Sequence, residues 1–205
     1  MQGYIIDIKA VKDDDLIVTI LCEKELITTY RFYGARHSNI NIGYKIDFEL
    51  EKTKSSISRL KDVMQLGFPW ILNSEKMYAW QRYLKLFYTH LKELEEPDSF
   101  YFKTLEELVT KINKQNVLRA IVESYILLLE HEGRLHTNFE CLICEIEVDF
   151  NLALIRGFIP VHKVCVNRAK SFEINKIKEL FNSKSSINLE DEEVEKLWEI
   201  ILLGL

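Results

Sequence analysis

The sequence predicts an α+β fold in which a small β-barrel precedes an all-helical part, and two observations support this. From Gly3 to about Phe68, five short runs show the period-two apolar pattern that is typical of strands. After Pro69 the apolar residues recur every three to four positions, which is typical of amphipathic helices. We therefore expect two domains, at residues 1–70 and residues 71–205.

The N-terminal domain is expected to hold five strands with short, antiparallel connections. The run from Leu16 to Cys22 is apolar on nearly both faces, as an interior strand would be, and Cys22 is expected to be a buried thiol. A small closed barrel of the oligonucleotide/oligosaccharide-binding (OB) type is one fold that such strands adopt. The expected strands are Tyr4–Ala10, Leu16–Cys22, Leu26–Tyr33, Tyr44–Leu50 and Ile57–Leu66.

The second domain is expected to be a helical bundle. The stretch Asn116–His131 is apolar almost all round, which places this helix in the middle of the bundle. The other expected helices run from about Trp80 to Leu94, from Asp98 through Ile112, near Phe172–Phe181, and from Asn188 to the C-terminal end.

Four potential metal ligands interrupt the helical part, within residues 139–167. Cys141, Cys144, His162 and Cys165 form the pattern C-x2-C-x17-H-x2-C, two tight pairs at a zinc-finger spacing. Four protein ligands leave no open position for water or substrate, so the pattern predicts a structural Zn²⁺ site. Alternatively, two of the cysteines are ordinary buried residues and His162 lies on the surface.

Charge limits the possible partners. The chain carries 27 Lys and Arg against 32 Asp and Glu, a net charge of −5, which predicts no general affinity for polyanions. Residues 31–61 are the locally basic exception, and Arg31, Lys45 and Arg59 within them are candidate DNA contacts. With no leader, no apolar run of membrane length and no disulfide framework, we expect a cytoplasmic protein that does not enter a membrane.

Aromatic and cationic residues alternate from Tyr30 to His37, at the end of one expected strand. Aromatic rings stack on bases while arginines contact phosphates, so Tyr30, Phe32, Arg31 and Arg36 could hold a single strand without reading its sequence. The alternative is that Tyr30 and Phe32 point into the core and the arginines are merely solvated.

Catalytic motifs do not support an enzyme. The segment from His131 to His136 resembles the H-E-x-x-H metalloprotease helix, but its second histidine is one position late and Gly133 interrupts the helix. Glu140 precedes Cys141 where a zinc deaminase needs proline, and the phosphate-binding and nucleophile motifs are missing. We expect a protein that is not an enzyme.

The N-terminal motifs resemble those of the RecO family of recombination mediators. The matching residues are Gly3-Tyr4-Ile5-Ile6, then Asp15-Leu16-Ile17-Val18-Thr19-Ile20-Leu21, then Gly34-Ala35-Arg36. The helical second part with an inserted C-x-x-C is similar in outline. The resemblance implies an OB-type N-terminal domain, a helical domain with a zinc module, and Arg36 as the best DNA contact.

The same resemblance implies a bacterial, nucleoid-associated role in recombinational DNA repair. RecO-like proteins bind single- and double-stranded DNA, anneal complementary strands, bind the C-terminal tail of single-strand binding protein, and act with RecR to load RecA. A groove near Arg119 or Arg134 is a candidate for that tail, since such a peptide needs a cation near an apolar hole. The alternative function, which the acidic balance favours, is a zinc-containing protein-interaction module without direct DNA binding.

Overall fold

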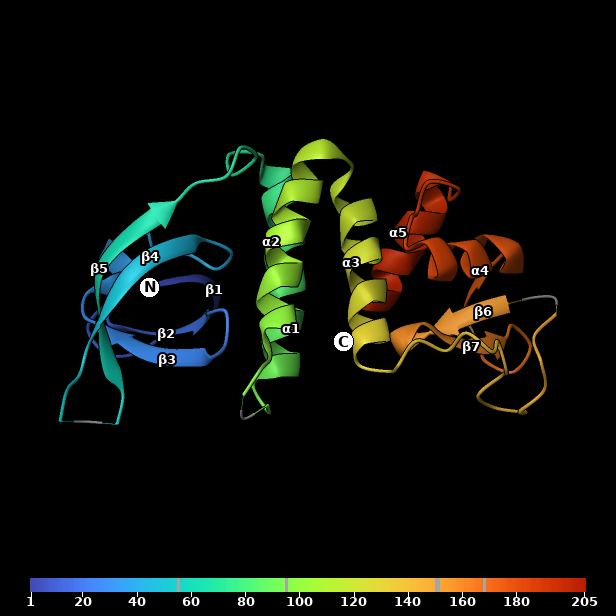
Figure 1. The fold of residues 1–205 in the computed structure, drawn as a ribbon, viewed down its shortest axis with the longest axis horizontal. Coiled ribbons are helices and arrows are strands. Elements are labelled where there is room, and N and C mark those ends of the chain that lie inside the picture. Colours follow the sequence, from blue (N-terminus) through green and yellow to red (C-terminus); the bar gives the residue numbers. More distant parts are fainter. Residues whose placement is uncertain (55, 95, 150–151, 168) are drawn as a thin grey trace. The chain divides into compact units, whose positions relative to one another are not determined.

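The computed structural model describes residues 1–54, 56–94, 96–149, 152–167 and 169–205, and these form two compact units (Figure 1). Unit 1 comprises Met1–Lys114 and unit 2 comprises Gln115–Leu205. The expected division at residue 70 separates strands from helices, whereas the compact units divide after Lys114. The domain boundary at residue 70 therefore stays a prediction.

Unit 1 begins with a closed five-stranded barrel, as the sequence predicted (Figure 1). Its strand order is β1-β2-β3-β5-β4, and every neighbouring pair is antiparallel except β3 and β5, which run parallel. This closure leaves no exposed sheet edge. The strands are β1 (Gln2–Ala10), β2 (Leu16–Leu21), β3 (Leu26–Arg31), β4 (Lys45–Glu51) and β5 (Ser58–Leu66).

The barrel core follows the alternation of β2. Leu16, Val18, Ile20 and Cys22 lie in one buried cluster with residues of the other strands. Cys22 is 6% exposed, as expected for a buried thiol, and burial raises its pKa to about 12.

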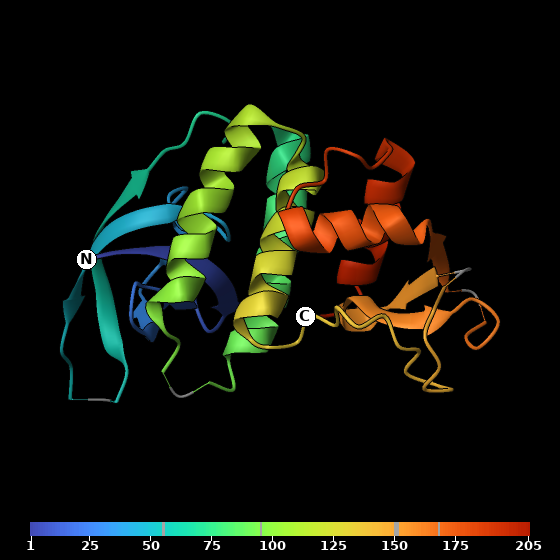
Figure 2. The ribbon, with the colours of Figure 1, turned by 45° about the vertical axis from the view of Figure 1, so that its right-hand side comes forward.

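Two helices complete unit 1, α1 (Ser74–Leu91) and α2 (Ser99–Lys114) (Figure 2). The Asn73 side chain caps α1 by accepting from the Lys76 amide, so the helix begins earlier than the apolar stripe alone indicates. Tyr4 of β1 is buried with its ring 5.8 Å from Trp80 of α1 and 5.7 Å from Phe102 of α2. These aromatic contacts join the barrel to both helices.

Unit 2 is built around α3 (Val117–His131), ten of whose residues are buried, in agreement with its predicted central place. Helices α4 (Ile174–Ser183) and α5 (Asp191–Ile201) follow, and α3 contacts α5. The prediction of an all-helical second part missed one feature, a three-stranded antiparallel sheet of order β7-β6-β8. Its strands are β6 (Leu152–Ile155), β7 (Ile159–His162) and β8 (Lys170–Phe172).

Among the described residues, none of the helices has both the length and the apolar character required to cross a membrane.

Candidate nucleic-acid interface and metal centre

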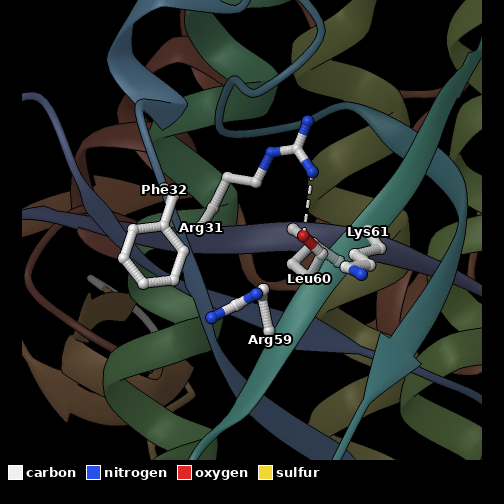
Figure 3. A pocket seen from close by; sticks show the side chains of 5 residues that line it. All are labelled: Arg31, Phe32, Arg59, Leu60 and Lys61. Atoms are coloured by element: carbon white, nitrogen blue, oxygen red, sulfur yellow. Dashed lines mark hydrogen bonds between the residues drawn. The ribbon is translucent and has the colours of Figure 1, made fainter.

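The barrel surface has an aromatic and cationic groove where β3 meets β5 (Figure 3). The parallel pairing of these strands comprises only Thr29 with Ser58 and Tyr30 with Arg59. Beyond it, Nη1 of Arg31 donates to the Leu60 carbonyl at 2.8 Å, so a side chain supplies the hydrogen bond that a longer strand would make. Phe32 lies just past the end of β3.

The groove contains an open hollow of about 370 Å³. Phe32 is 44% exposed, which excludes the alternative that its ring belongs to the core. The guanidinium carbon of Arg59 lies 4.5 Å from the centre of that ring, a cation–π contact. The hollow is lined by Arg31, Phe32, Arg59, Leu60 and Lys61 (Figure 3).

A second hollow of about 290 Å³ lies on the same surface and shares Phe32 and Arg59 with the first. Its remaining lining, Tyr30, Thr53 and Ile57, carries no formal charge. The stacked pair of Phe32 and Arg59 thus borders both a cationic hollow and a mostly apolar one.

One carboxylate serves both β5 cations. Glu51 of β4 accepts from Lys61 at 2.7 Å through Oε1 and from Arg59 at 3.1 Å through Oε2. The hydrogen bond from Lys61 is the main reason that the pKa of Glu51 is lowered, so the carboxylate is ionised at neutral pH. Arg31 differs, because no ion pair of Arg31 occurs among the described residues.

Asp15 fixes the chain at the end of β3. It is 9% exposed and accepts from the Tyr30 hydroxyl at 2.5 Å and from the Tyr33 amide at 2.7 Å. The hydrogen bond from Tyr30 is the main cause of its lowered pKa. Because these bonds flank Phe32 in the sequence, Asp15 sets the direction in which the phenyl ring leaves the strand.

The four predicted DNA contacts do not form one cluster. Arg31 and Arg59 share the groove, whereas Arg36 lies in the short 3₁₀ turn Gly34–Arg36, where it is 66% exposed and pairs with Asp14 at 2.7 Å. Lys45 is 19% exposed and pairs with Glu106 of α2 at 2.8 Å. Their roles in DNA binding stay predictions, and Lys61 is a groove residue that was not among them.

In unit 2, Cys141, Cys144, His162 and Cys165 converge, as the spacing predicted. Their ligand atoms all lie within 4.8 Å of one another. The turns Cys141–Cys144 and His162–Cys165 carry one pair each, and the Leu142 amide donates to the Pro160 carbonyl at 3.1 Å, which links the first turn to β7. The cluster could hold a metal ion, which excludes the reading of His162 as an unrelated surface residue.

The spacing of the ligand atoms fits a tetrahedral ion. With Zn–S near 2.3 Å and Zn–N near 2.05 Å, tetrahedral ligands lie about 3.8 Å apart for two sulfurs and about 3.6 Å for sulfur and nitrogen. The Sγ atoms of Cys144 and Cys165 are 3.9 Å apart, and Nδ1 of His162 is 3.3 Å from the first and 4.0 Å from the second. All four cysteines of the chain are free thiols.

Backbone amides favour the thiolate form of Cys141, which is the form that binds a cation. Burial alone would raise the pKa of Cys141, but the amides of His162, Cys144 and Ile143 donate to its sulfur and lower the pKa to about 6. Cys165 shows the opposite balance, because burial and hydrogen bonds to the other two thiols raise its pKa to about 11. A bound cation would offset the cost of collecting several thiolates in one place.

The cations proposed for a peptide groove are engaged within unit 2. Arg119 of α3 donates to the carbonyls of Ser186 and Leu189 and pairs with Asp191 at 2.6 Å, while Arg134 pairs with Glu132 at 2.8 Å. Arg119 thus holds the segment that leads into α5. The location of a groove for the tail of single-strand binding protein stays a prediction.

Together these features define a class of protein: an OB-like barrel with an aromatic and cationic groove, followed by a helical unit that carries a Cys₃His cluster. Residues 1–71 match the family model described as RecO N terminal. This match confirms the resemblance over those residues. The search of curated proteins gives no match.

Proposed function

We propose that this protein is a recombination mediator that binds single-stranded DNA through the barrel groove. The observation that carries the proposal is the exposed Phe32 ring, stacked with Arg59 and adjacent to Arg31, in a domain that matches RecO. Bases stack on such a ring whatever their identity, while guanidinium groups contact the phosphates. The groove is therefore suited to binding without sequence preference.

The rest of the proposed activity extends the resemblance to RecO, which the match over residues 1–71 supports. The protein binds double-stranded DNA as well, anneals complementary strands, and acts with RecR to load RecA onto DNA coated with single-strand binding protein, whose C-terminal tail it contacts. It works without catalysis, in the cytoplasm at the nucleoid. Strand annealing on DNA pre-coated with single-strand binding protein tests the mediator role, because a generic DNA binder does not accelerate that reaction.

DNA binding itself is tested by fluorescence anisotropy with a labelled oligothymidylate at two salt concentrations. Phe32→Ala should weaken binding roughly fivefold or more, since stacking contributes about 1–3 kcal/mol per base. Arg31→Ala and Arg36→Ala should also weaken it. Tyr78→Ala is the matched control, because Tyr78 is a 64% exposed ring of α1 with Arg82 against it at 5.6 Å. A wild-type protein that does not bind, or equal losses for Phe32 and Tyr78, would contradict the proposal.

We also propose that the Cys₃His cluster binds one structural Zn²⁺. The ion would hold the two ligand turns together, and its chemistry there is confined to that cross-link because four protein ligands complete its shell. Elemental analysis should find about one zinc per chain. Cys144→Ser should lose the metal and unfold the turns of unit 2, whereas Cys22→Ala, in the barrel core, should keep it. A stable wild-type protein without metal would refute the assignment.

The second candidate function is a protein-interaction module without direct DNA binding. It is favoured by four exposed aliphatic side chains on the ligand-bearing turns and beside them, Leu142, Ile143, Ile146 and Val164, each at least 55% exposed. Monomeric proteins seldom gather such residues at the surface without a partner. A partner that is retained after nuclease treatment, together with no binding of oligothymidylate, would select this function.

A further inference from the structure

We infer that Glu51 is a specificity-determining residue that makes the groove favour single-stranded over duplex DNA. The inference rests on the proposed function, since it concerns the same groove. It starts from the two ion pairs of Glu51, whose two oxygens hold Lys61 at 2.7 Å and Arg59 at 3.1 Å. A DNA phosphate would likewise present two charged oxygens to these two cations. Glu51 therefore competes with phosphate for this part of the groove.

The cations of the groove are consequently unequal. Each oxygen of Glu51 lies against one of the two β5 cations, so a phosphate at Arg59 or Lys61 must share them with a carboxylate that repels it. Arg31 has no ion pair among the described residues, and its guanidinium is held in place by the Leu60 carbonyl at 2.8 Å (Figure 3). A phosphate that approaches the groove can thus engage Arg31 while both Glu51 pairs stay intact.

A single strand can use this arrangement. Its unpaired base can stack on Phe32 beside the mostly apolar hollow of Tyr30 and Ile57, while its phosphate lies by Arg31. Both contacts are possible without moving Glu51. Stacking on Phe32 then adds to the contact between the phosphate and Arg31. A single strand therefore does not need Arg59 and Lys61, the two cations that pair with Glu51.

Duplex DNA meets the same groove differently. Its bases are paired and stacked inside the helix, so only its phosphates reach the surface, at a density of about one charge per 1.7 Å of axis. To bind, a duplex needs Arg59 and Lys61 as well as Arg31. It must therefore displace Glu51 or bind beside it, and a Glu51 that stays in place repels the phosphates. Such a repulsive group against the unwanted ligand is a common source of specificity.

The test compares Glu51→Gln with wild type for two labelled probes, an oligothymidylate and a hairpin duplex with the same number of phosphates. Glu51→Gln should strengthen duplex binding about three- to tenfold, the range expected when two exposed ion pairs are released. It should change single-strand binding less than about twofold, since stacking on Phe32 dominates there. Phe32→Ala should do the reverse, weakening single-strand binding more than duplex binding.

Glu49→Gln is the matched control, because Glu49 lies two residues earlier on β4, is exposed, and makes none of the ion pairs found in the described part of the chain. It removes the same charge without freeing a cation. Equal gains for the two probes in Glu51→Gln, or an equal duplex gain in Glu49→Gln, would overturn the inference alone. A wild-type protein that binds neither probe would refute the proposed function as well.

Discussion

Replacing Glu123 tests whether one buried carboxylate of α3 holds unit 2 together. Glu123 is 7% exposed, and its Oε1 accepts from the amide of Ser186 at 3.1 Å and from the Ser186 hydroxyl at 2.9 Å. Its Oε2 accepts from Nε2 of Gln115 at 3.1 Å. Ser186 is 1% exposed, so water cannot replace these bonds. The carboxylate thereby fixes the chain between α4 and α5 against α3.

The loss of stability expected for Glu123→Ala follows from the hydrogen-bond donors that it leaves unpaired. Glu123→Ala leaves two buried donors of Ser186 without an acceptor, at about 1–3 kcal/mol each. A total near 3 kcal/mol is therefore expected. Glu123→Gln keeps one acceptor oxygen but loses its charge, and charge-assisted bonds are roughly twice as strong as neutral ones, so about half of that loss is expected.

Hydrogen exchange read by mass spectrometry measures this loss for each unit separately. A cost of about 3 kcal/mol should accelerate the slowest amides of α5 roughly a hundredfold while the barrel peptides stay unchanged. Glu195→Ala, at an exposed position of α5, is the control and should change exchange little. The reasoning would be refuted if Glu123→Ala exchanged within twofold of wild type, or no faster than the control.

Two further predictions concern pH and backbone geometry. Burial alone would raise the pKa of Glu193, but hydrogen bonds from Lys176 and the Glu190 amide lower it. The ionised Glu193 therefore stabilises the fold above about pH 4.5, and this stabilisation is lost as the pH falls through the lowered pKa. Thermal melts should show this acid loss in wild type, and Lys176→Met should reduce it. Gly43 has a φ of +91°, and an added Cβ would lie 2.8 Å from the Trp80 ring. Gly43→Ala should therefore lower the free energy of unfolding in urea by about 1–3 kcal/mol. Gly67→Ala is the control and should lower it little, because the space around Gly67 is open.

Local patterns were sufficient to predict the barrel. Each predicted strand lies within two residues of an observed one, because alternation in a run such as Leu16–Leu21 is imposed by burial on one side of a sheet. The helix that opens unit 2 was predicted almost to the residue, since Asn116 caps it and Gly133 follows its end.

The three-stranded sheet of unit 2 was missed for a physical reason. Its strands are three or four residues long, which is too short to establish a period, and two of them lie between the metal-ligand pairs. The cluster brings the pairs together across 17 intervening residues, and β7 ends at the ligand His162. The sheet thus depends on contacts that a local pattern does not contain.

Charge counting alone could not rank the cations of the barrel. Lys45 and Arg59 were equivalent in the sequence, yet Glu106, 61 residues later, pairs with Lys45, which is shielded beside the rings of Tyr4 and Phe102. For the groove a signal did exist. Arg59 and Lys61 are two residues apart and so share one face of β5, with Glu51 on the neighbouring strand in register with Arg59.

The pairing of these cations with Glu51 limits how steeply the proposed DNA binding of this acidic chain should depend on salt. Each phosphate neutralised on a single strand contributes a slope of about −0.7 to the logarithmic salt dependence. If Arg31 alone acts, the slope is near that value, and if Arg59 and Lys61 are also released from Glu51, it reaches about −2. A slope steeper than about −2 for oligothymidylate would show that cations outside the groove, such as the exposed Arg36, add to those inside it.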